Sequence, residues 1–501
     1  MTTKLLAGVV VLLLLSQAAS PSILQTHISL LIQNASIVDG SGRPAFGGDV
    51  RIKNGKIVEI GRIKPRAGEA VFDAAGLVLA PGFIDIHNHS QTGLLRGGAA
   101  ANQVSQGITT VVVGPDGGSP FPLQGYFAKL EGKTAVNVAS FIGHATLREQ
   151  VMKKDFVRKA TDAEIAQMQK LLEQSMGEGA FGFSSGLEYD VGFSASTEEM
   201  IALARVAAKL GGIYMTHMRD EEEGMLDALR EAIRIGREAS IPVQISHIKM
   251  GNRNVWGKSA DAIRLIDETR RSGFDITADA YPYTAWASTI TVLVPSRKHE
   301  DRAEIEKGLH NVGGADKVLV TACPAHRDYE GKTLEQIAAA ENTSPVDVYI
   351  KIVKDGGAGV VCNSMNEADV HAFFRQSWVM VSSDGGIGSR HPRGTGTFTR
   401  VLGRFVRDNK LVSLEEAVRK MTAMPASRLG LKDRGMIKKG MAADFVLFDP
   451  EAVIDQATFT EPQLLSEGVR AVFVNGVKVW EGSKPTGNLP GRVIRKNERA
   501  R

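Results

Sequence analysis

Cysteine is almost absent from this chain of 501 residues, which contains only Cys323 and Cys362. Neither residue belongs to a CxxC or a Cys/His pattern, so the sequence does not support a cysteine-based zinc site, and a disulfide between the two stays open. Aromatic residues make up only 6% of the chain, and the formal net charge is only +4. Because the sequence has no basic stripe with interleaved aromatics, it gives no reason to expect a nucleic-acid partner.

Long apolar runs are also missing, with one exception at the start of the chain. Lys4 precedes an apolar run over residues 5–15, and small residues follow as far as Ser20. This pattern is typical of a signal peptide over residues 1–20, cut near Ala18, and it predicts a periplasmic or secreted protein. The run is too short to span a bilayer comfortably, so we expect no stable membrane insertion after cleavage. An uncleaved anchor is the alternative.

The rest of the chain has similar strand-and-turn segments at both ends. Short strand-like segments flank Asn54-Gly55 near the start and Asn475-Gly476 near the end, and Asn-Gly is a strong hairpin signal. We therefore expect a small β-sandwich domain formed by residues 21–80 and 432–490. Beyond it, the basic residues of segment 491–501 predict a solvated tail; they are Arg492, Arg495, Lys496, Arg499 and Arg501.

Residues 81–431 alternate short apolar runs with amphipathic helical stretches. Several of these stretches begin with a capping box, at Thr161, Ser196 and Ser413, each followed three residues later by a glutamate. This alternation predicts an α/β fold with a parallel sheet, best fitted by a TIM (β/α)8 barrel with an insertion at about 283–375. An open doubly wound sheet is the alternative, although no GxGxxG or phosphate loop follows any run. The predicted strands are 83–87, 109–113, 136–144, 180–184, 212–217, 242–247, 274–280 and 378–384.

The few histidines fall at particular places in this pattern. The chain has 11 of them, and four stand at the carboxyl ends of predicted strands, where a TIM barrel builds its active site. Asp384 ends the last predicted strand in the same way. A single histidine at a strand end is usually structural, but this combination predicts a metal centre; its histidines are His87, His89, His217 and His247.

Imidazole and carboxylate ligands suit Zn²⁺, in one or two ions, although nickel, cobalt or manganese are also compatible with them. A catalytic zinc lowers the pKa of its bound water to about 7, so hydroxide is available near neutral pH. A free carboxylate beside the ion can take the proton and return it to a leaving nitrogen. We predict this role for Asp384.

Longer motifs resemble those of the amidohydrolase superfamily. The metal-ligand motif FIDIHNH covers residues 83–89, and GMIKKGMAADFV at 435–446 is similar to the segment by which such enzymes re-enter their β-domain. Further segments look like the N-acyl-D-amino-acid deacylase (D-aminoacylase) branch. They are GHATLR (143–148), GFSSGL (182–187), THMRDE (216–221), SHIK (246–249), YPYTA (281–285), and SDG (383–385) with GTF (396–398). The likeness runs from about residue 28 to 482.

The resemblance implies hydrolysis of the amide bond of an N-acyl-D-amino acid or a D-dipeptide by metal-bound hydroxide. It places the principal metal on His217 and His247 with Asp116, and a second ion on His87 and His89. The branch typically carries a cysteine in a Gly-Asn-Cys-Gly setting where this chain has Gly114-Pro115-Asp116-Gly117. Asp116 is a hard oxygen donor that can still bridge two ions, and a turn-stabilising loop aspartate is the alternative.

Other superfamily branches use a carboxylated lysine after strand four, but segment 180–184 contains no lysine. Glu188, just beyond it, is another possible carboxylate ligand, but we expect it to be only a loop residue, and His144 is either structural or near the site. An N-acyl amino acid presents a carboxylate, so we expect it to contact Tyr283, Arg393 and Lys249.

Two other functions stay open at this point. The first is a cyclic-amide hydrolase (hydantoinase- or dihydropyrimidinase-like) or a dipeptidase of the same superfamily, which would use the same chemistry on another substrate. Asp116, in place of the cysteine, is the feature that keeps this alternative open. The second is a non-catalytic binding protein on the same fold, although such a protein is expected to have lost ligands and here the ligand set is altered at only one position. The expected partner is a small-molecule substrate, with no particular oligomeric state.

Overall fold

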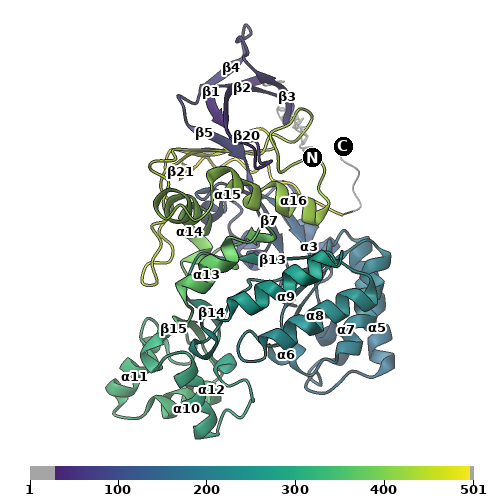
Figure 1. Ribbon diagram of the computed structural model, residues 1–501, viewed down its shortest axis with the longest axis vertical. Coiled ribbons are helices and arrows are strands. Elements are labelled where there is room, and N and C mark those ends of the chain that lie inside the picture. The colour runs from purple at the N-terminus through teal and green to yellow at the C-terminus, as the bar shows by residue number, and fades with distance from the viewer. Residues whose placement is uncertain (1–28, 497–501) are drawn as a thin grey trace, which may run out of the picture.

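The computed structural model describes residues 29–496, so the predicted signal peptide lies outside the described residues. Figure 1 shows a sheet at one end of the molecule, a helix-rich body below it, and a smaller lobe at the opposite end. The end sheet has nine strands taken from both ends of the described chain. They are β1 (Ser29–Ile37), β2 (Phe46–Lys53), β3 (Lys56–Gly61), β4 (Ala70–Asp73), β5 (Val78–Pro81), β18 (Phe445–Phe448), β19 (Val469–Val474), β20 (Val477–Glu481) and β21 (Lys484–Pro485).

The two Asn-Gly pairs form the turns that the sequence predicted. Asn54 and Gly55 join β2 to β3, with φ of 53° and 72°. Asn475 and Gly476 join β19 to β20, with φ of 50° and 82°. Two consecutive positive φ angles suit the right-handed twist of a hairpin, and asparagine and glycine adopt them at low cost.

The helix-rich body contains two parallel sheets. The first is β6 (Phe83–Asp85), β7 (Ile108–Val113) and β8 (Asn137–Ser140), in that order. The second has the order β17-β13-β12-β11-β10-β9; its strands are β9 (Ile142–Gly143), β10 (Gly182–Gly186), β11 (Ile213–His217), β12 (Val243–Ile245), β13 (Ile276–Ala280) and β17 (Val379–Val381). Nearly every residue of these strands is buried, as expected for parallel strands covered by helices.

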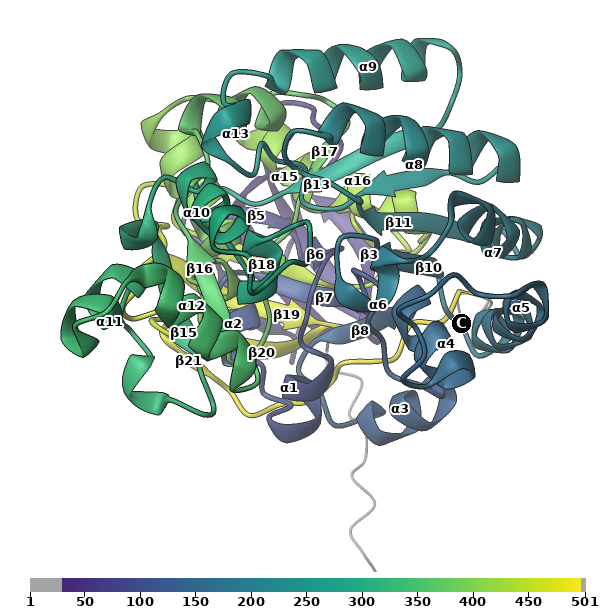
Figure 2. The ribbon, with the colours of Figure 1, turned by 90° about the horizontal axis from the view of Figure 1, so that it is seen from below.

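Helices surround these strands in Figure 2, which looks at the molecule from below. The long covering helices bury one apolar face each, as amphipathic helices do. The helices of the body are α1 (Gln91–Arg96), α2 (Ala101–Val104), α3 (Leu123–Leu130), α4 (His144–Met152), α5 (Asp162–Gly177), α6 (Asp190–Phe193), α7 (Thr197–Lys209), α8 (Met225–Ala239), α9 (Ser259–Arg271), α13 (Glu367–Phe374), α14 (Arg393–Arg400), α15 (Leu414–Met421) and α16 (Ala423–Leu429).

The predicted helix starts are at the predicted caps. Thr161 begins α5 with a complete capping box to Glu164. Ser196 caps α7 through the backbone N–H of Glu199, but the Glu199 carboxylate does not return to the cap. Instead it accepts hydrogen bonds from His144 (2.8 Å) and Arg148 (2.7 Å). His144 is therefore a buried structural residue that braces α4 against α7.

The predicted insertion between β13 and β17 forms the smaller lobe. It contains an antiparallel sheet of β14 (Trp286–Thr289), β16 (Gly359–Cys362) and β15 (Val318–Ala322), together with α10 (Arg302–Asn311), α11 (Leu334–Glu341) and α12 (Pro345–Lys354). Cys362 pairs in register with Val318, whereas Cys323 follows the other end of β15. Both cysteines are buried and free, which answers the open question about a disulfide.

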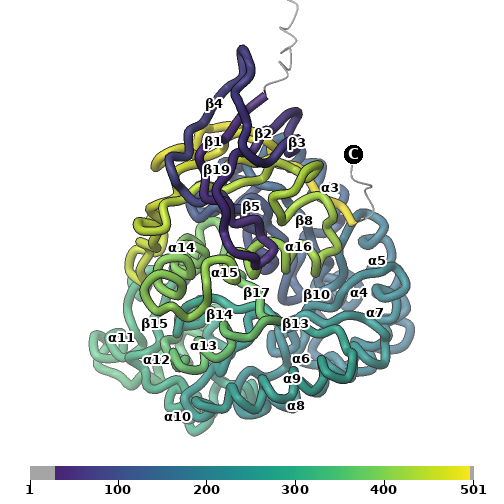
Figure 3. The backbone as a smooth tube through the Cα atoms, turned by 45° about the horizontal axis from the view of Figure 1, so that its top comes forward, coloured from purple at the N-terminus to yellow at the C-terminus, as the bar shows by residue number. Residues whose placement is uncertain are grey.

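The prediction of a solvated tail is wrong for residues 491–496. The backbone N–H of Val138 donates to Arg492 (2.9 Å), and that of Ile494 donates to Val138 (2.8 Å). Val493 is 5% exposed. In Figure 3 the last described residues run beside the body rather than away from it. The apolar residues Val493 and Ile494, which lie between the basic ones, supply the buried contact.

Within residues 29–496, no helix is both long and apolar enough to cross a bilayer.

Candidate metal centre

All six predicted metal-centre residues meet at the carboxyl ends of the parallel strands. Only His217 ends a strand, β11. The others lie two to four residues beyond the ends of β6, β7, β12 and β17, in the loops that follow, and β6, β12 and β17 stop earlier than predicted; they are His87, His89, Asp116, His247 and Asp384. Sequence reasoning therefore found the right edge of the sheet but placed most of these side chains on strands instead of in the loops that follow.

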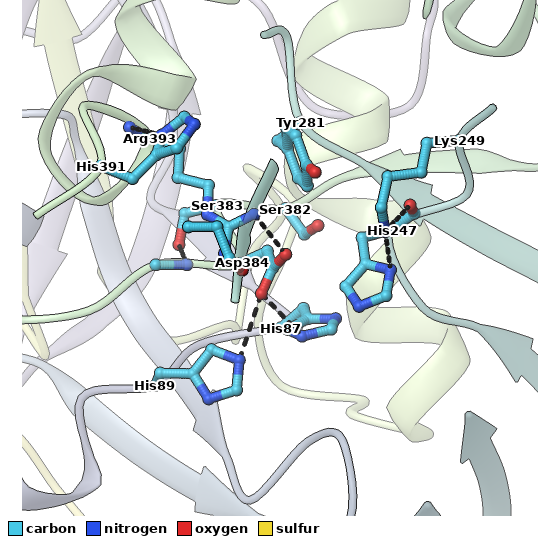
Figure 4. Close-up of polar contacts among 12 residues, drawn as sticks. His87, His89, His247, Lys249, Tyr281, Ser382, Ser383, Asp384, His391 and Arg393 are labelled. Carbon is cyan, nitrogen blue, oxygen red and sulfur yellow. Dashed lines mark hydrogen bonds and ion pairs between the residues drawn. The ribbon is translucent and has the colours of Figure 1, made fainter. Parts of the chain in front are cut away.

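The first group of ligand atoms comes from two histidines and two aspartates. His87 Nε2 lies 3.0 Å from Asp116 Oδ2 and 3.3 Å from Asp384 Oδ1. His89 Nε2 lies 3.2 Å from the same Asp384 oxygen and 3.4 Å from Asp116 Oδ2. Figure 4 shows Asp384 between the two imidazoles. These four residues offer atoms that lie within 4.8 Å of one another, which is the spacing of ligands around one ion.

A second group joins His217 and His247 to the same aspartate. His247 Nε2 is 3.5 Å from Asp116 Oδ2 and 2.9 Å from His217 Nδ1. Asp116 therefore belongs to both groups. Its Oδ1 is buried without a hydrogen-bond partner among the described residues. The geometry favours the ligand interpretation of Asp116 over that of a turn-stabilising loop residue.

The backbone at this edge is bent in an unusual way. Asp116, His247 and Asp384 have φ of 52°, 32° and 47°. Residues other than glycine rarely adopt positive φ, which costs about 1 kcal/mol or more at each position. Such outliers persist where the surrounding structure holds them, and they cluster at functional sites. Here they turn three of the candidate ligands out of their strands and toward one point.

Buried carboxylates behind the histidines were not predicted. Asp279, on β13, accepts a hydrogen bond from the backbone N–H of His247 (2.9 Å) and lies 3.3 Å from His87 Nδ1. Asp85, on β6, accepts from the backbone N–H of Ser383 (2.9 Å) and from Asn88 (2.8 Å). A signal was present in the sequence, because each aspartate stands inside an otherwise apolar strand, where a charge needs a partner.

Two glutamates also reach the histidines. Glu188 Oε2 is 2.6 Å from His217 Nε2, so the expectation of a simple loop residue is wrong. Glu221, which was not predicted, lies 3.0 Å from His247 Nδ1 and pairs with Lys249. Lys249 Nζ is itself 2.9 Å from His247 Nδ1. The loops after β10, β11 and β12 therefore contribute a second layer of charge around the centre.

The electrostatics of the cluster favour a cation. Burial by itself lowers the pKa of the His87 imidazole, but the carboxylates of Asp116, Asp384 and Asp279 outweigh it and hold that pKa well above its usual value. Burial raises the pKa of Asp116, yet the histidines around it keep the pKa well below the usual range. A site that attracts protons this strongly presents negative charge and imidazole nitrogens to any metal ion that displaces them.

A pocket that is partly open to solvent lies beside the cluster. Lys249 and Arg393 line it, as predicted for substrate contacts, and so does Tyr281. Arg393 Nη1 is 2.6 Å from Asp384 Oδ2, and its guanidinium lies 4.7 Å from the centre of the Tyr281 ring.

Contrary to the prediction, Tyr283 is not among the lining residues. It is buried, its hydroxyl approaches the Pro392 carbonyl (3.4 Å), and Arg400 stacks on its ring. Tyr281 stands nearer the end of β13 and takes the position in the pocket.

A family model described as the amidohydrolase family matches residues 70–363 and 375–480. The chain belongs to this family. D-Aminoacylase from Alcaligenes xylosoxydans xylosoxydans is 38% identical, covering 93% of this chain and 97% of that protein. N-acyl-D-glutamate deacylase from the same organism is 35% identical, covering 95% and 98%. These near-full-length matches place the chain with the amidohydrolases that deacylate N-acyl-D-amino acids.

Solved amidohydrolase structures agree with this placement. The crystal structure of a D-aminoacylase is 36% identical, with a TM-score of 0.84, and covers 93% of this chain and 99% of that one. N-acyl-D-glutamate deacylase from Bordetella bronchiseptica, in complex with zinc and a phosphonate mimic of the tetrahedral intermediate, is 34% identical with a TM-score of 0.85, covering 94% and 100%. A binuclear metal centre is described in a D-aminoacylase of 36% identity.

Proposed function

We propose that this chain is a metal-dependent hydrolase that cleaves the amide bond of N-acyl-D-amino acids. The observation that carries the proposal is the combination of near-full-length identity of 35–38% to deacylases of this class with a metal-ligand cluster beside a pocket. The cyclic-amide alternative has weaker support, because the solved D-hydantoinase is only 17% identical, with a TM-score of 0.57. Likeness at that level concerns the fold alone.

The residues of the cluster fit a zinc centre. Imidazole nitrogens and carboxylate oxygens are common zinc ligands, and the unpartnered Asp116 Oδ1 leaves a donor free within the cluster. We assign His217 and His247 to the principal ion, which they would hold together with Asp116, and His87 with His89 would hold a second or weaker ion. When bound, the metal supplies Lewis acidity and lowers the pKa of water to about 7. The soft thiolate of the related enzymes is replaced here by a hard oxygen.

Asp384 is the group that we assign to proton transfer. Burial raises the pKa of its carboxyl, but Arg393, His247 and His87 outweigh burial and hold the pKa well below the usual range. The ionised carboxylate faces the cluster through Oδ1 and Arg393 through Oδ2. The Asp384 carboxylate can therefore accept a proton from the water that attacks the amide carbonyl and then give that proton to the leaving nitrogen. Arg393 fixes the orientation of the carboxylate.

The substrate carboxylate needs a positive partner in the pocket. Arg393 and Lys249 line the pocket beside Tyr281. Arg393 begins α14, which follows β17, whereas Lys249 and Tyr281 lie just after β12 and β13. We assign these two cations to the carboxylate of the substrate. An ion pair of this kind orients the amide toward the metal centre, which is where positioning contributes most to the rate.

We also propose that the two parallel sheets form one closed (β/α)8 barrel, in which β8 and β9 together take the place of the single predicted strand 136–144. Three contacts support closure. The first is the parallel bridge from Asn88 to Gly385, which links the ends of β6 and β17. Phe141, between β8 and β9, donates its N–H to Val113 of β7 (2.9 Å). Phe181, just before β10, donates to Ser140 of β8 (3.0 Å).

The terminal sheet is proposed to fold over itself as a β-sandwich. Phe72 of β4 meets Phe473 of β19 edge-to-face, 6.2 Å apart between ring centres. Strands β4 and β19 are not neighbours in the sheet order, since β4 pairs with β1 and β19 lies between β18 and β20.

Export to the periplasm or the medium remains our proposal for the location of the enzyme. It rests on the sequence pattern of residues 1–20.

The test of the proposed function is a substrate panel run on the purified enzyme with its metal content measured in parallel. We expect hydrolysis of N-acetyl-D-amino acids and much slower turnover of the L-enantiomers. Asp384→Asn is expected to lower kcat about 10²- to 10⁴-fold while the metal content stays the same. Opening of hydantoin or dihydropyrimidine rings without any deacylation would reject the proposal.

A further inference from the structure

Part of the pocket lining is not used by the proposed chemistry, which uses the metal-centre residues, Arg393 and Lys249. The remaining lining, here called the second end of the pocket, includes Glu222 and Gly251, from the loops after β11 and β12. The insertion contributes Trp286, Ser288 and Val292 to it. A substrate held by its amide and its carboxylate has its side chain left to meet this part of the lining.

The cations of this pocket are already paired. Lys249 pairs with Glu221 and Arg393 pairs with Asp384, and we have assigned both to the substrate carboxylate. The residues described as lining the pocket include no other lysine or arginine. Nothing in this lining is therefore left to neutralise a second negative charge on a substrate.

Glu222 makes this end electronegative when its carboxyl is ionised, which requires a pH above its pKa of about 8. None of the ion pairs found among the described residues involves it, and its neighbours Glu188 and Asp220 are also acidic. Its carboxyl is hydrogen-bonded by Asn252, whose own Oδ1 is buried without a partner among the described residues. The second end thus offers hydrogen-bond acceptors and an apolar wall. Such a surface receives a donor or a cation and repels an anion.

We propose that the enzyme takes N-acyl-D-amino acids with neutral or basic side chains and rejects acidic ones, with Glu222 as the specificity-determining residue. This inference rests on the proposed function and adds the substrate class. It separates this chain from relatives named for the deacylation of N-acyl-D-glutamate and N-acyl-D-aspartate. An acidic side chain would bring a third carboxylate beside Glu222 and Glu188. Repulsion between like charges raises the free energy of binding far more inside a pocket than in water.

The test compares two substrates of the same shape, N-acetyl-D-glutamine and N-acetyl-D-glutamate, on the metal-loaded enzyme. Assays at pH 9 keep Glu222 ionised, because burial and its acidic neighbours raise its pKa to about 8. We expect kcat/KM to favour the glutamine compound by at least about ten-fold. Glu222→Gln should reduce this preference several-fold, whereas Glu223→Gln, which changes an exposed neighbour outside the lining, should leave it unchanged.

A second matched pair tests the other sign of charge. N-acetyl-D-lysine (acylated at the α-nitrogen) should be hydrolysed at least as fast as N-acetyl-D-norleucine by the wild type, and more slowly than it by Glu222→Gln. Each preference is a ratio measured within one preparation, so partial misfolding of a variant does not alter it.

The outcomes are distinct. Equal rates on the glutamine and glutamate compounds, or a preference for glutamate, overturn the inference and leave the deacylase function standing. A preference that survives Glu222→Gln unchanged overturns the role of Glu222. Failure to hydrolyse any N-acetyl-D-amino acid rejects the proposed function itself, together with the inference that rests on it.

Discussion

Asp116 is the residue at which this chain departs from the motif that it otherwise resembles. The structure puts one of its carboxylate oxygens within 3.0 to 3.5 Å of nitrogens from His87, His89 and His247. This single oxygen lies among three imidazoles from two loops, so it could be shared between two ions. An oxygen in place of a sulfur at this position would favour harder metal ions.

Asp116→Ala should weaken metal binding by at least about ten-fold, because it removes the only group shared by both ligand sets. Equilibrium competition with a chelator measures this affinity. Asp116→Cys should restore binding and, in the Co²⁺-loaded protein, add a thiolate-to-metal charge-transfer band that the wild type lacks. Asp155→Ala, at an exposed aspartate far from the cluster in the sequence, is the control. An unchanged affinity in Asp116→Ala would mean that Asp116 is not a ligand.

At the scale of elements, the terminal sheet is held by a buried ion pair as well as by its apolar core. Arg51 of β2 is 2% exposed and donates to both oxygens of Glu69, at 2.7 and 3.0 Å. Two parallel N–H···O bonds of this kind are among the stronger polar contacts in proteins. The pair ties the loop before β4 to β2, the strand next to the edge strand β3.

This pair predicts a pH dependence. The hydrogen bonds from Arg51, together with one from Ser29, outweigh burial and lower the pKa of Glu69 to about 2. A lowered carboxyl pKa stabilises the fold above the ordinary value of 4.5, and that stabilisation is lost as the pH falls toward 2. Glu69→Gln should therefore unfold more easily than the wild type at pH 7, by about 2 kcal/mol.

Urea denaturation at pH 7 and at pH 3 measures the difference. It should shrink at the lower pH, because Glu69 in the unfolded chain, with its ordinary pKa of 4.5, is then protonated, whereas the folded protein still keeps most of this carboxyl ionised. Glu131→Gln, at an exposed glutamate after α3, should show no comparable difference at either pH. A gap that stays constant between the two pH values would contradict the assignment.

At the scale of the whole molecule, the chain passes from the terminal sheet into the body after β5, returns to the sheet at β18, and runs against the body after β21. The C-terminal segment runs along β8, where Gly491 donates to Thr134 (2.8 Å) and Lys496 donates to Gly179 (3.1 Å). Val493 is buried between these contacts. The two parts of the molecule are therefore stabilised by a segment that is distant in sequence from everything it touches.

Val493→Asp should destabilise the protein by at least about 2 kcal/mol, since it removes a buried valine and puts a carboxylate in its place. Thermal unfolding followed by circular dichroism measures the change. Leu489→Asp is the matched control, because Leu489 is 39% exposed and the same substitution should have little effect there. Equal losses of stability in the two variants would show that the segment is not anchored at Val493.

The sequence alone determined features that depend on local pattern. Alternating apolar runs and capped helices predicted the α/β class, the Asn-Gly pairs predicted the hairpins, and the histidine pattern predicted the edge of the sheet at which the candidate ligands gather. These features are set by residues within a few positions of one another, which is why a local pattern is enough to predict them.

Only the tertiary structure decided what depends on contacts between distant segments. It placed Asp279 and Glu221 behind the histidines, exchanged Tyr283 for Tyr281 in the pocket, and brought Glu188 to His217. It also packed residues 491–496 against β8. A buried carboxylate or a basic tail has no local signature of its partner, because that partner comes from another loop or strand and is fixed only when the chain has folded.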